Sequence, residues 1–171
     1  MHLKFRPSAS GSIPAIECDG YVPLVARWRE AYVDLVYHRL GDFERTLVEF
    51  AFQKPELDLV QLTIVSVPAE FNVDEVKNCS EECDNAAVPY LATGSPNVGE
   101  RVDESASISW NTEANRLSIL FSPSGKNLGK VYGCGSIDFF VTRENELFRI
   151  DFKHLNDAAI ANFRQACGVA S

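Results

Sequence analysis

The chain has 171 residues, of which 46% are hydrophobic and 23% charged, and its formal net charge is −8. This size and composition predict one globular domain over residues 1–171 and exclude a disordered or collagen-like chain. No apolar run approaches the roughly 18 residues needed to cross a bilayer. The start of the chain is basic but lacks the apolar stretch of a secretory signal, so we expect a cytoplasmic protein.

The first part of the chain predicts β-strands. A short strand is expected near residues 2–6. Aromatic and β-branched residues then accumulate over 22–39 and favour a strand over a helix. A hairpin follows, with strands at 46–53 and 57–67. Pro55 fits its turn, because proline cannot donate to a strand ladder.

Acidic residues are concentrated between Pro68 and Glu104. This segment has nine acids against two basic residues, a net charge of −7, and the rest of the chain is close to neutral. The acids are Glu70, Asp74, Glu75, Glu81, Glu82, Asp84, Glu100, Asp103 and Glu104. Residues 73–83 predict at most a helical turn or two. A connection this long is more often functional or mobile than idle.

The sign of this charge bears on the partner. Nucleic acid and anionic membranes both attract positive protein surfaces, so we expect neither as a partner. An acidic linker that only keeps the protein soluble is the alternative explanation.

Strand alternation resumes after the acidic segment. We expect a strand at 106–110, a turn at 111–115 and a returning strand with Leu117, Ile119 and Phe121 on one face. This β-meander predicts antiparallel pairing in the second half of the chain.

The clearest hairpin signal lies at Ser136–Lys153, where two alternating strands flank the polar turn 143–146. The residues expected to share a face are Ile137, Phe139 and Val141 on the first strand and Phe148, Ile150 and Phe152 on the second. After it, Asn156 is a good helix N-cap and Gly168 a natural stop. We therefore predict a mainly β (α+β) fold, with antiparallel sheets from two β-meander units in a sandwich or barrel and a C-terminal helix packed on the sheet.

The upstream hairpin can be aligned with the downstream one. Val48, Phe50 and Phe52 then match Ile137, Phe139 and Val141, and Val60 and Leu62 match Ile150 and Phe152. The match predicts duplicated halves at 22–68 and 105–155, joined by an acidic connection at 69–104. The alternative is that any two amphipathic hairpins align when shifted freely.

The sequence contains no motif that indicates catalysis. The histidines are scattered, and neither a phosphate-binding loop nor a nucleophile elbow occurs. Cys79 and Cys83 have the spacing of half a zinc site, but a second close pair is missing. Cys134 lies between two glycines, a pattern that is more typical of a bend in the chain than of a nucleophile. We therefore expect no enzyme, no cofactor and no metal, with the odd number of cysteines present as thiols.

Residues 107–157 resemble a small bacterial β-rich family of unknown function. The resemblance rests on Asn111–Leu117, which matches a strand–turn–strand motif, and on Ile137–Phe139, Glu146–Phe152 and Leu155–Asp157, which match the elements after it. Asn111 and Glu146 depart from the usual aspartate and glycine. The acidic, β-rich character of the whole chain also resembles the immunity proteins encoded beside bacterial toxins, including those of contact-dependent growth inhibition. That resemblance implies a toxin domain as partner.

Three functions remain open at this point. The leading hypothesis is an immunity protein that blocks a basic toxin domain, such as a ribonuclease or deoxyribonuclease. The expected toxin-binding residues are Glu70, Asp74, Glu75, Glu81, Glu82, Asp84, Asp103 and Glu104, with exposed aromatics such as Tyr90. The second hypothesis is a small-molecule-binding barrel or sandwich, whose expected cavity residues are Trp28, Tyr32, Phe50 and Phe139. The third is an enzyme that uses Cys134 or a carboxylate pair.

Overall fold

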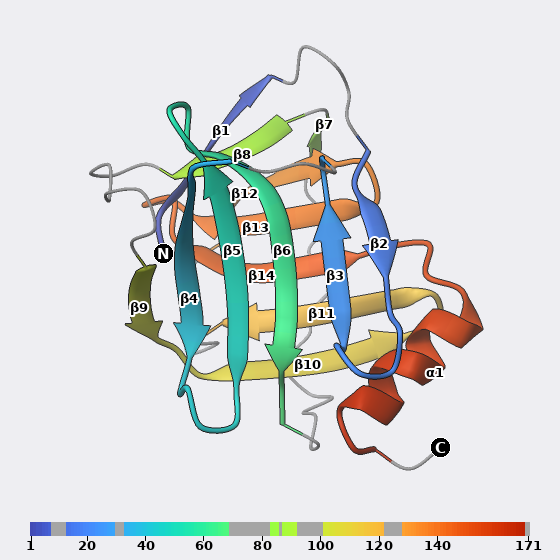
Figure 1. Cartoon of the computed structure of the whole chain (residues 1–171). Coiled ribbons are helices and arrows are strands. Elements are labelled where there is room, and N and C mark those ends of the chain that lie inside the picture. The colour runs from blue at the N-terminus through green and yellow to red at the C-terminus, as the bar shows by residue number, and fades with distance from the viewer. Residues whose placement is uncertain are drawn as a thin grey trace.

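The structure, a computed structural model, describes residues 1–7, 13–29, 33–68, 83–85, 87–91, 101–121 and 128–169. Two β-sheets face each other with their strands running crosswise, and a C-terminal helix packs against them at one end (Figure 1). This confirms the predicted class, a mainly β protein with a sandwich-like pair of sheets. No helix in these ranges is long and apolar enough to cross a membrane.

Within the described ranges the first sheet has eight strands. They are β1 (Leu3–Pro7), β2 (Ala15–Glu17), β3 (Leu24–Arg27), β4 (Leu35–Gly41), β5 (Leu47–Gln53), β6 (Asp58–Ser66), β8 (Ala87–Leu91) and β9 (Arg101–Ser105). Their order is β1-β8-β6-β5-β4-β9, with β3 also pairing with β6, and β2 with β3. The pairs are antiparallel except that β9 runs parallel to β4.

The described part of the second sheet has six strands in the order β10-β11-β14-β13-β12-β7. They are β7 (Cys83–Asn85), β10 (Ile108–Glu113), β11 (Arg116–Phe121), β12 (Leu128–Cys134), β13 (Ile137–Thr142) and β14 (Leu147–Phe152). Here β7 runs parallel to β12. The meander β4-β5-β6 thus corresponds to β12-β13-β14, and each has a parallel edge strand from the acidic connection. Duplicated halves would produce this shared order, and the duplication stays a prediction.

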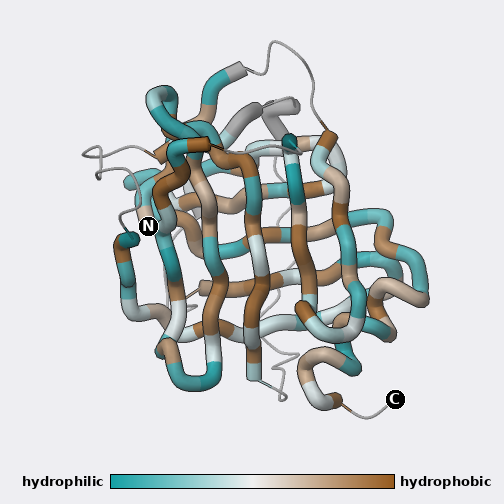
Figure 2. Tube along the Cα trace, viewed as in Figure 1, coloured by the Kyte–Doolittle hydropathy of each residue, from teal (hydrophilic) through white to brown (hydrophobic). Residues whose placement is uncertain are grey.

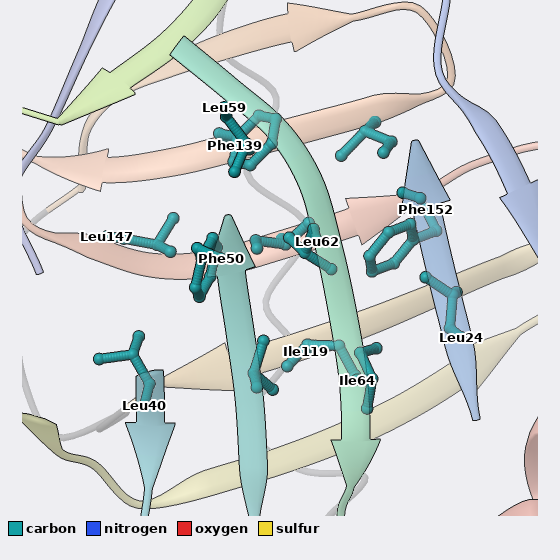
Figure 3. Close-up of a cluster of buried hydrophobic side chains, with 14 of the residues drawn as sticks. Leu24, Leu40, Phe50, Leu59, Leu62, Ile64, Ile119, Phe139, Leu147 and Phe152 are labelled. Carbon is teal, nitrogen blue, oxygen red and sulfur yellow. The ribbon is translucent and has the colours of Figure 1, made fainter. Parts of the chain in front are cut away.

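The core lies between the inner faces of the two sheets. Phe50, Leu62 and Ile64 from the first sheet meet Phe139 and Phe152 from the second, and all five are fully buried (Figure 3). Hydrophobic residues follow the strands of both sheets, whereas the tight turns are hydrophilic (Figure 2). Burial of these apolar side chains is the main force that holds the sheets together.

The downstream hairpin forms as predicted, but the sequence assigned Phe148 to the wrong face of its second strand. Phe140 pairs with Arg149 and Val141 with Leu147, so Phe148 is the extra residue of a β-bulge. Leu147 therefore joins the core and is 5% exposed. The prediction that Phe148 shares the inner face is wrong, because the bulge interrupts the period-two alternation.

One of the two bulges of the upstream hairpin lies at the corresponding place. Phe50 pairs with Leu62 and Phe52 with Leu59, so that Val60 is the extra residue. Superposing the two ladders matches Leu62 with Ile150. The alignment made from the sequence was therefore two residues out of register on the second strand.

Other elements differ in their bounds. The expected strand at 22–39 is two strands, β3 and β4, which pair with different neighbours. The expected turn at 111–115 is shorter, because β10 continues to Glu113. Strands β2, β7, β8, β9 and β12 were not predicted. The helical turns considered for 73–83 lie outside the described residues, apart from Cys83, which begins β7.

The helix α1 (Asp157–Ala166) begins as predicted. The side chain of Asn156 accepts a hydrogen bond from the backbone N–H of Ala159 at 2.8 Å. Its buried residue Phe163 packs edge-on against Trp110 of β10, with ring centroids 5.0 Å apart. The helix therefore closes the end of the sandwich beside β10 (Figure 1).

Candidate functional site

The structure describes three of the eight acids expected to bind a toxin. Asp84 lies on β7, where only the backbone is described, and Asp103 and Glu104 lie on β9. The other five, Glu70, Asp74, Glu75, Glu81 and Glu82, lie outside the described residues. The candidate site can therefore be built from β9, at the point where the acidic connection returns to the first sheet.

Asp103 lies on the outer face of the sheet and is paired with arginines of the same chain. Arg39 of β4 donates two hydrogen bonds to its carboxylate, from Nε and Nη2, each at 2.8 Å. Arg101 lies 3.5 Å from the same carboxylate. The hydrogen bonds from Arg39 lower the pKa of Asp103, so this acid is ionised and compensated.

Glu104 points to the inner side of the same strand. Its carboxylate lies 2.5 Å from the amino group of Met1 and 2.9 Å from Nε2 of His38. Burial by itself would raise the pKa of Glu104, but the hydrogen bonds and charges of these two groups outweigh it and lower the pKa. In His38 burial is the larger effect and lowers the pKa, although Glu104 opposes it. Glu104 is thus charged near neutral pH while the imidazole is neutral.

Both described ends of the acidic connection are tied to the sheets. At its start, the indole N–H of Trp110 donates to the carbonyl oxygen of Pro68 at 2.7 Å. At its end, Arg39 and His38 hold β9 onto β4. Between them the chain contributes β7 to one sheet and β8 to the other. The connection is therefore attached to the two sheets at four places, namely Pro68, β7, β8 and β9.

Tyr90 of β8 is less exposed than expected. It is half-buried, and the guanidinium of Arg6 lies over its ring, 5.2 Å from the centroid. Arg6 also forms an ion pair with Asp58 of β6. Tyr90 therefore helps to hold β1 and β8 on the sheet, which leaves less of its surface for a partner.

Cys134 is buried rather than poised for attack. It is 4% exposed and accepts a hydrogen bond from the indole N–H of Trp28, with 2.9 Å between the nitrogen and the sulfur. Burial raises the pKa of the thiol, whereas a nucleophilic cysteine needs a lowered one. Within the described ranges no group of three or more His, Cys, Asp or Glu side chains could hold a metal ion.

The aromatic residues expected around a ligand cavity belong to the core. Trp28, Phe50 and Phe139 all belong to the hydrophobic core cluster between the sheets. The rings of Trp28 and Phe139 lie 6.4 Å apart. Tyr32 lies outside the described residues. These side chains pack against one another and give no support to the small-molecule hypothesis.

No protein-family model matches the chain, and a search of curated proteins finds no significantly similar sequence. The case for a function therefore rests on the charges and geometry of the chain itself.

Three groups at this site were missed by sequence reasoning: His38, Arg39 and the amino group of Met1. The contact between His38 and Glu104 joins residues 66 positions apart through the parallel pairing of β4 and β9. No local sequence pattern predicts that β4 and β9 pair. The alternation over 35–41 does indicate that His38 and Arg39 lie on opposite faces of one strand. It does not indicate which strand they contact.

Proposed function

We propose that this protein is an immunity protein, which binds a basic bacterial toxin domain and blocks its active surface. The observation that carries the proposal is the distribution of charge. The segment Pro68–Glu104 holds a net charge of −7 out of −8 for the whole chain. A toxin domain that cuts nucleic acid must present positive charge to its substrate, and an acidic segment would occupy that surface in place of the substrate.

The ion pairs of the scaffold support this reading. Arg27 pairs with Glu17, Lys153 with Asp138, and Arg6 with Asp58. Outside Pro68–Glu104 the sequence has 15 acids against 14 basic residues, so nearly all of the excess negative charge belongs to the connection. Such a local excess steers a basic partner toward one region and raises the rate of association.

The anchoring of the connection supports the proposal further. Its ends are fixed by Trp110 at Pro68 and by Arg39 at Asp103. A segment whose ends are already fixed loses less conformational entropy on binding than a free tail of the same length. In this proposal Asp103 and Glu104 mainly hold the connection in place, and the acids at 70–84 make most of the electrostatic contact.

The first test is co-expression with the product of the neighbouring reading frame. We expect that product to be toxic alone and harmless together with this protein, and we expect the two to co-purify as a complex. If the neighbouring product is harmless alone, or if it stays toxic and unbound in the presence of this protein, the proposal fails.

A second test asks which acids bind. Glu70→Gln, Asp74→Asn and Glu75→Gln in one variant should slow association at low salt about tenfold or more, since steering follows local charge. The matched control removes three exposed scaffold acids, Glu44→Gln, Glu113→Gln and Glu144→Gln, with the same change in net charge. Equal association rates for the two variants would show that net charge alone, and not the connection, attracts the toxin.

A further inference from the structure

Among the strands that the structure describes, β9 is the last in the order of the first sheet and forms its edge. The backbone N–H of Ala106 donates to the carbonyl oxygen of Gly41 at 3.1 Å. Backbone groups of successive residues in a strand point alternately to either side. The N–H and C=O groups of Val102 and Glu104 therefore also face β4.

By the same alternation, the backbone groups of Arg101, Asp103 and Ser105 point away from the sheet. Among the described residues no strand pairs with that side of β9. All three of these residues are exposed. Three residues with outward N–H and C=O groups form a short template for another strand.

The side chains on this edge are self-complementary. Arg101 carries a positive charge, Val102 is apolar and 38% exposed, and Asp103 carries a negative charge. If two such strands run antiparallel about Val102, each Arg101 lies opposite the partner's Asp103. The two valines then lie opposite each other.

We propose that β9 pairs antiparallel with β9 of a second copy of this chain, about a two-fold axis at Val102. The product is a symmetric dimer with a sheet that continues from one copy into the other. Symmetric contacts of this kind use the same patch on both subunits. The inference goes beyond the proposed function and needs no toxin.

The hydrogen-bond pattern agrees with this register. In an antiparallel pair, residues that exchange two hydrogen bonds alternate with residues that exchange none. Arg101 and the partner's Asp103 both point their backbone groups to the open side and form hydrogen-bonded pairs. Val102 faces β4 and occupies the closer, non-hydrogen-bonded position, where two apolar side chains pack well.

The charges choose this register over its nearest competitor. A two-fold axis at Asp103 would also bring outward-facing backbone groups of the two strands opposite each other. It would, however, place the two Asp103 side chains directly opposite each other, which is destabilising. The preferred register instead places the opposite charges of Arg101 and Asp103 across from each other at both ends.

The dimer is expected to be weak. A single short strand pair buries less than the roughly 1,200 Å² of a stable interface. We expect a dissociation constant of about 0.1–1 mM, at the weak end of the affinity scale.

Two measurements test the proposal on the full chain. Sedimentation velocity between about 0.01 and 1 mM should show a monomer–dimer equilibrium. Amide exchange followed by NMR should show that the N–H groups of Arg101 and Asp103 become protected as concentration rises. The N–H of Val102 should not change, because it already faces β4.

The variants are chosen at exposed positions so that the fold survives, which circular dichroism checks. Arg101→Asp places two aspartates opposite each other at both ends and should weaken the dimer about tenfold or more. Arg143→Asp, at an exposed turn far along the chain, makes the same change in net charge and should leave it unaltered. Val102→Lys should abolish the dimer, and Val102→Thr should retain most of it.

A chain that remains monomeric at 1 mM overturns the proposal. So does a dimer that Arg101→Asp and Val102→Lys leave intact, or one in which the amides of Arg101 and Asp103 stay unprotected. These last results would place the contact on another surface.

Discussion

Hairpins β5–β6 and β13–β14 have the same ladder from Val48 and Ile137 onward and differ in their outer faces. Position for position, Gln61 of β6 corresponds to Arg149 of β14, and Thr63 corresponds to Asp151. Gln61 donates to Thr63 at 2.9 Å, a neutral bond in a half-buried position. Arg149 donates twice to Asp151, each time at 2.6 Å, and both residues are buried. The two hairpins use the same spacing for a neutral pair in one case and an ionic pair in the other.

The inner faces show no such difference. Phe50 and Phe139 occupy the same ladder position, and each is fully buried in the one core cluster. The core restricts the inner positions to apolar residues of matching volume, whereas the outer positions are free to differ. The two hairpins therefore differ on their outer faces, where the guanidinium of Arg149 also lies over the ring of Phe140, 4.6 Å from its centroid.

The largest effect is expected from breaking the ionic pair. Asp151→Ala leaves the guanidinium of Arg149, which is 4% exposed, without its carboxylate. Removal of one partner of a buried pair costs roughly 3–5 kcal/mol. Chemical denaturation should show this loss in the free energy of unfolding. A loss below about 1 kcal/mol would mean that the pair is effectively solvated.

A double substitution tests whether the charges of this pair are themselves needed for stability. Arg149→Met with Asp151→Leu removes both charges and should recover most of the loss, because a well-packed apolar pair often replaces a buried ion pair at no cost. A double variant as unstable as Asp151→Ala would instead show that the charges themselves hold this face together.

The next prediction tests the likeness of the inner faces. Leu62→Ala and Ile150→Ala truncate corresponding core positions, which are 0% and 1% exposed. Each should destabilise the protein by roughly 2–5 kcal/mol, from lost burial and the cavity left behind. The two losses should agree within about 1 kcal/mol in the same denaturation experiment. A large difference would show that one hairpin is the weaker half of the core.

A pH dependence is expected in the first half of the chain. His38 of β4 corresponds in the ladder to Tyr132 of β12, whose ring stacks on Phe5 with centroids 3.9 Å apart. The groups that face His38 are Glu104 and the Met1 amino group, with Asp103 nearby, and burial lowers its pKa below the ordinary 6.5. The unfolded chain therefore binds more protons between the two pKa values. The free energy of unfolding should be highest above about pH 6.5 and should fall as the pH drops through the lowered pKa.

His38→Gln provides the control for this dependence. It keeps a hydrogen-bonding side chain at the position but cannot titrate. Unfolding measured between about pH 5 and 8 should show a shallower slope in the variant than in the natural chain. If both slopes agree, another group controls the pH dependence in that window. Glu104 does not confuse the result, because its pKa is lowered from 4.5 and it titrates at more acid pH.

Much of this architecture was accessible from local sequence patterns. The hairpin at 137–152, the strand of Leu117 and the helix after Asn156 all follow from periodicity and capping, which act over a few residues. The face of Phe148 was wrong because a bulge changes the alternation without leaving a local signal.

The remaining parts depend on contacts between distant segments. Strand β7 has three residues and β9 has five, and each is a strand only because β12 or β4 offers it a parallel edge. The pairing of Glu104 with His38 follows from that edge and was equally invisible. The excess of acid in the connection was readable from composition, but its attachment to both sheets was not.

The smallest effect is expected from the neutral pair that corresponds to Arg149 and Asp151. Thr63→Val keeps the β-branched shape of the side chain and removes the hydroxyl that accepts from Gln61. A neutral hydrogen bond contributes about 0.5–1.5 kcal/mol, and less where water can replace the lost partner. Both residues are half-buried, so the free energy of unfolding should fall by less than about 1 kcal/mol. A loss as large as that of Asp151→Ala would mean that the ladder position, and not the buried charge, determines what each pair contributes.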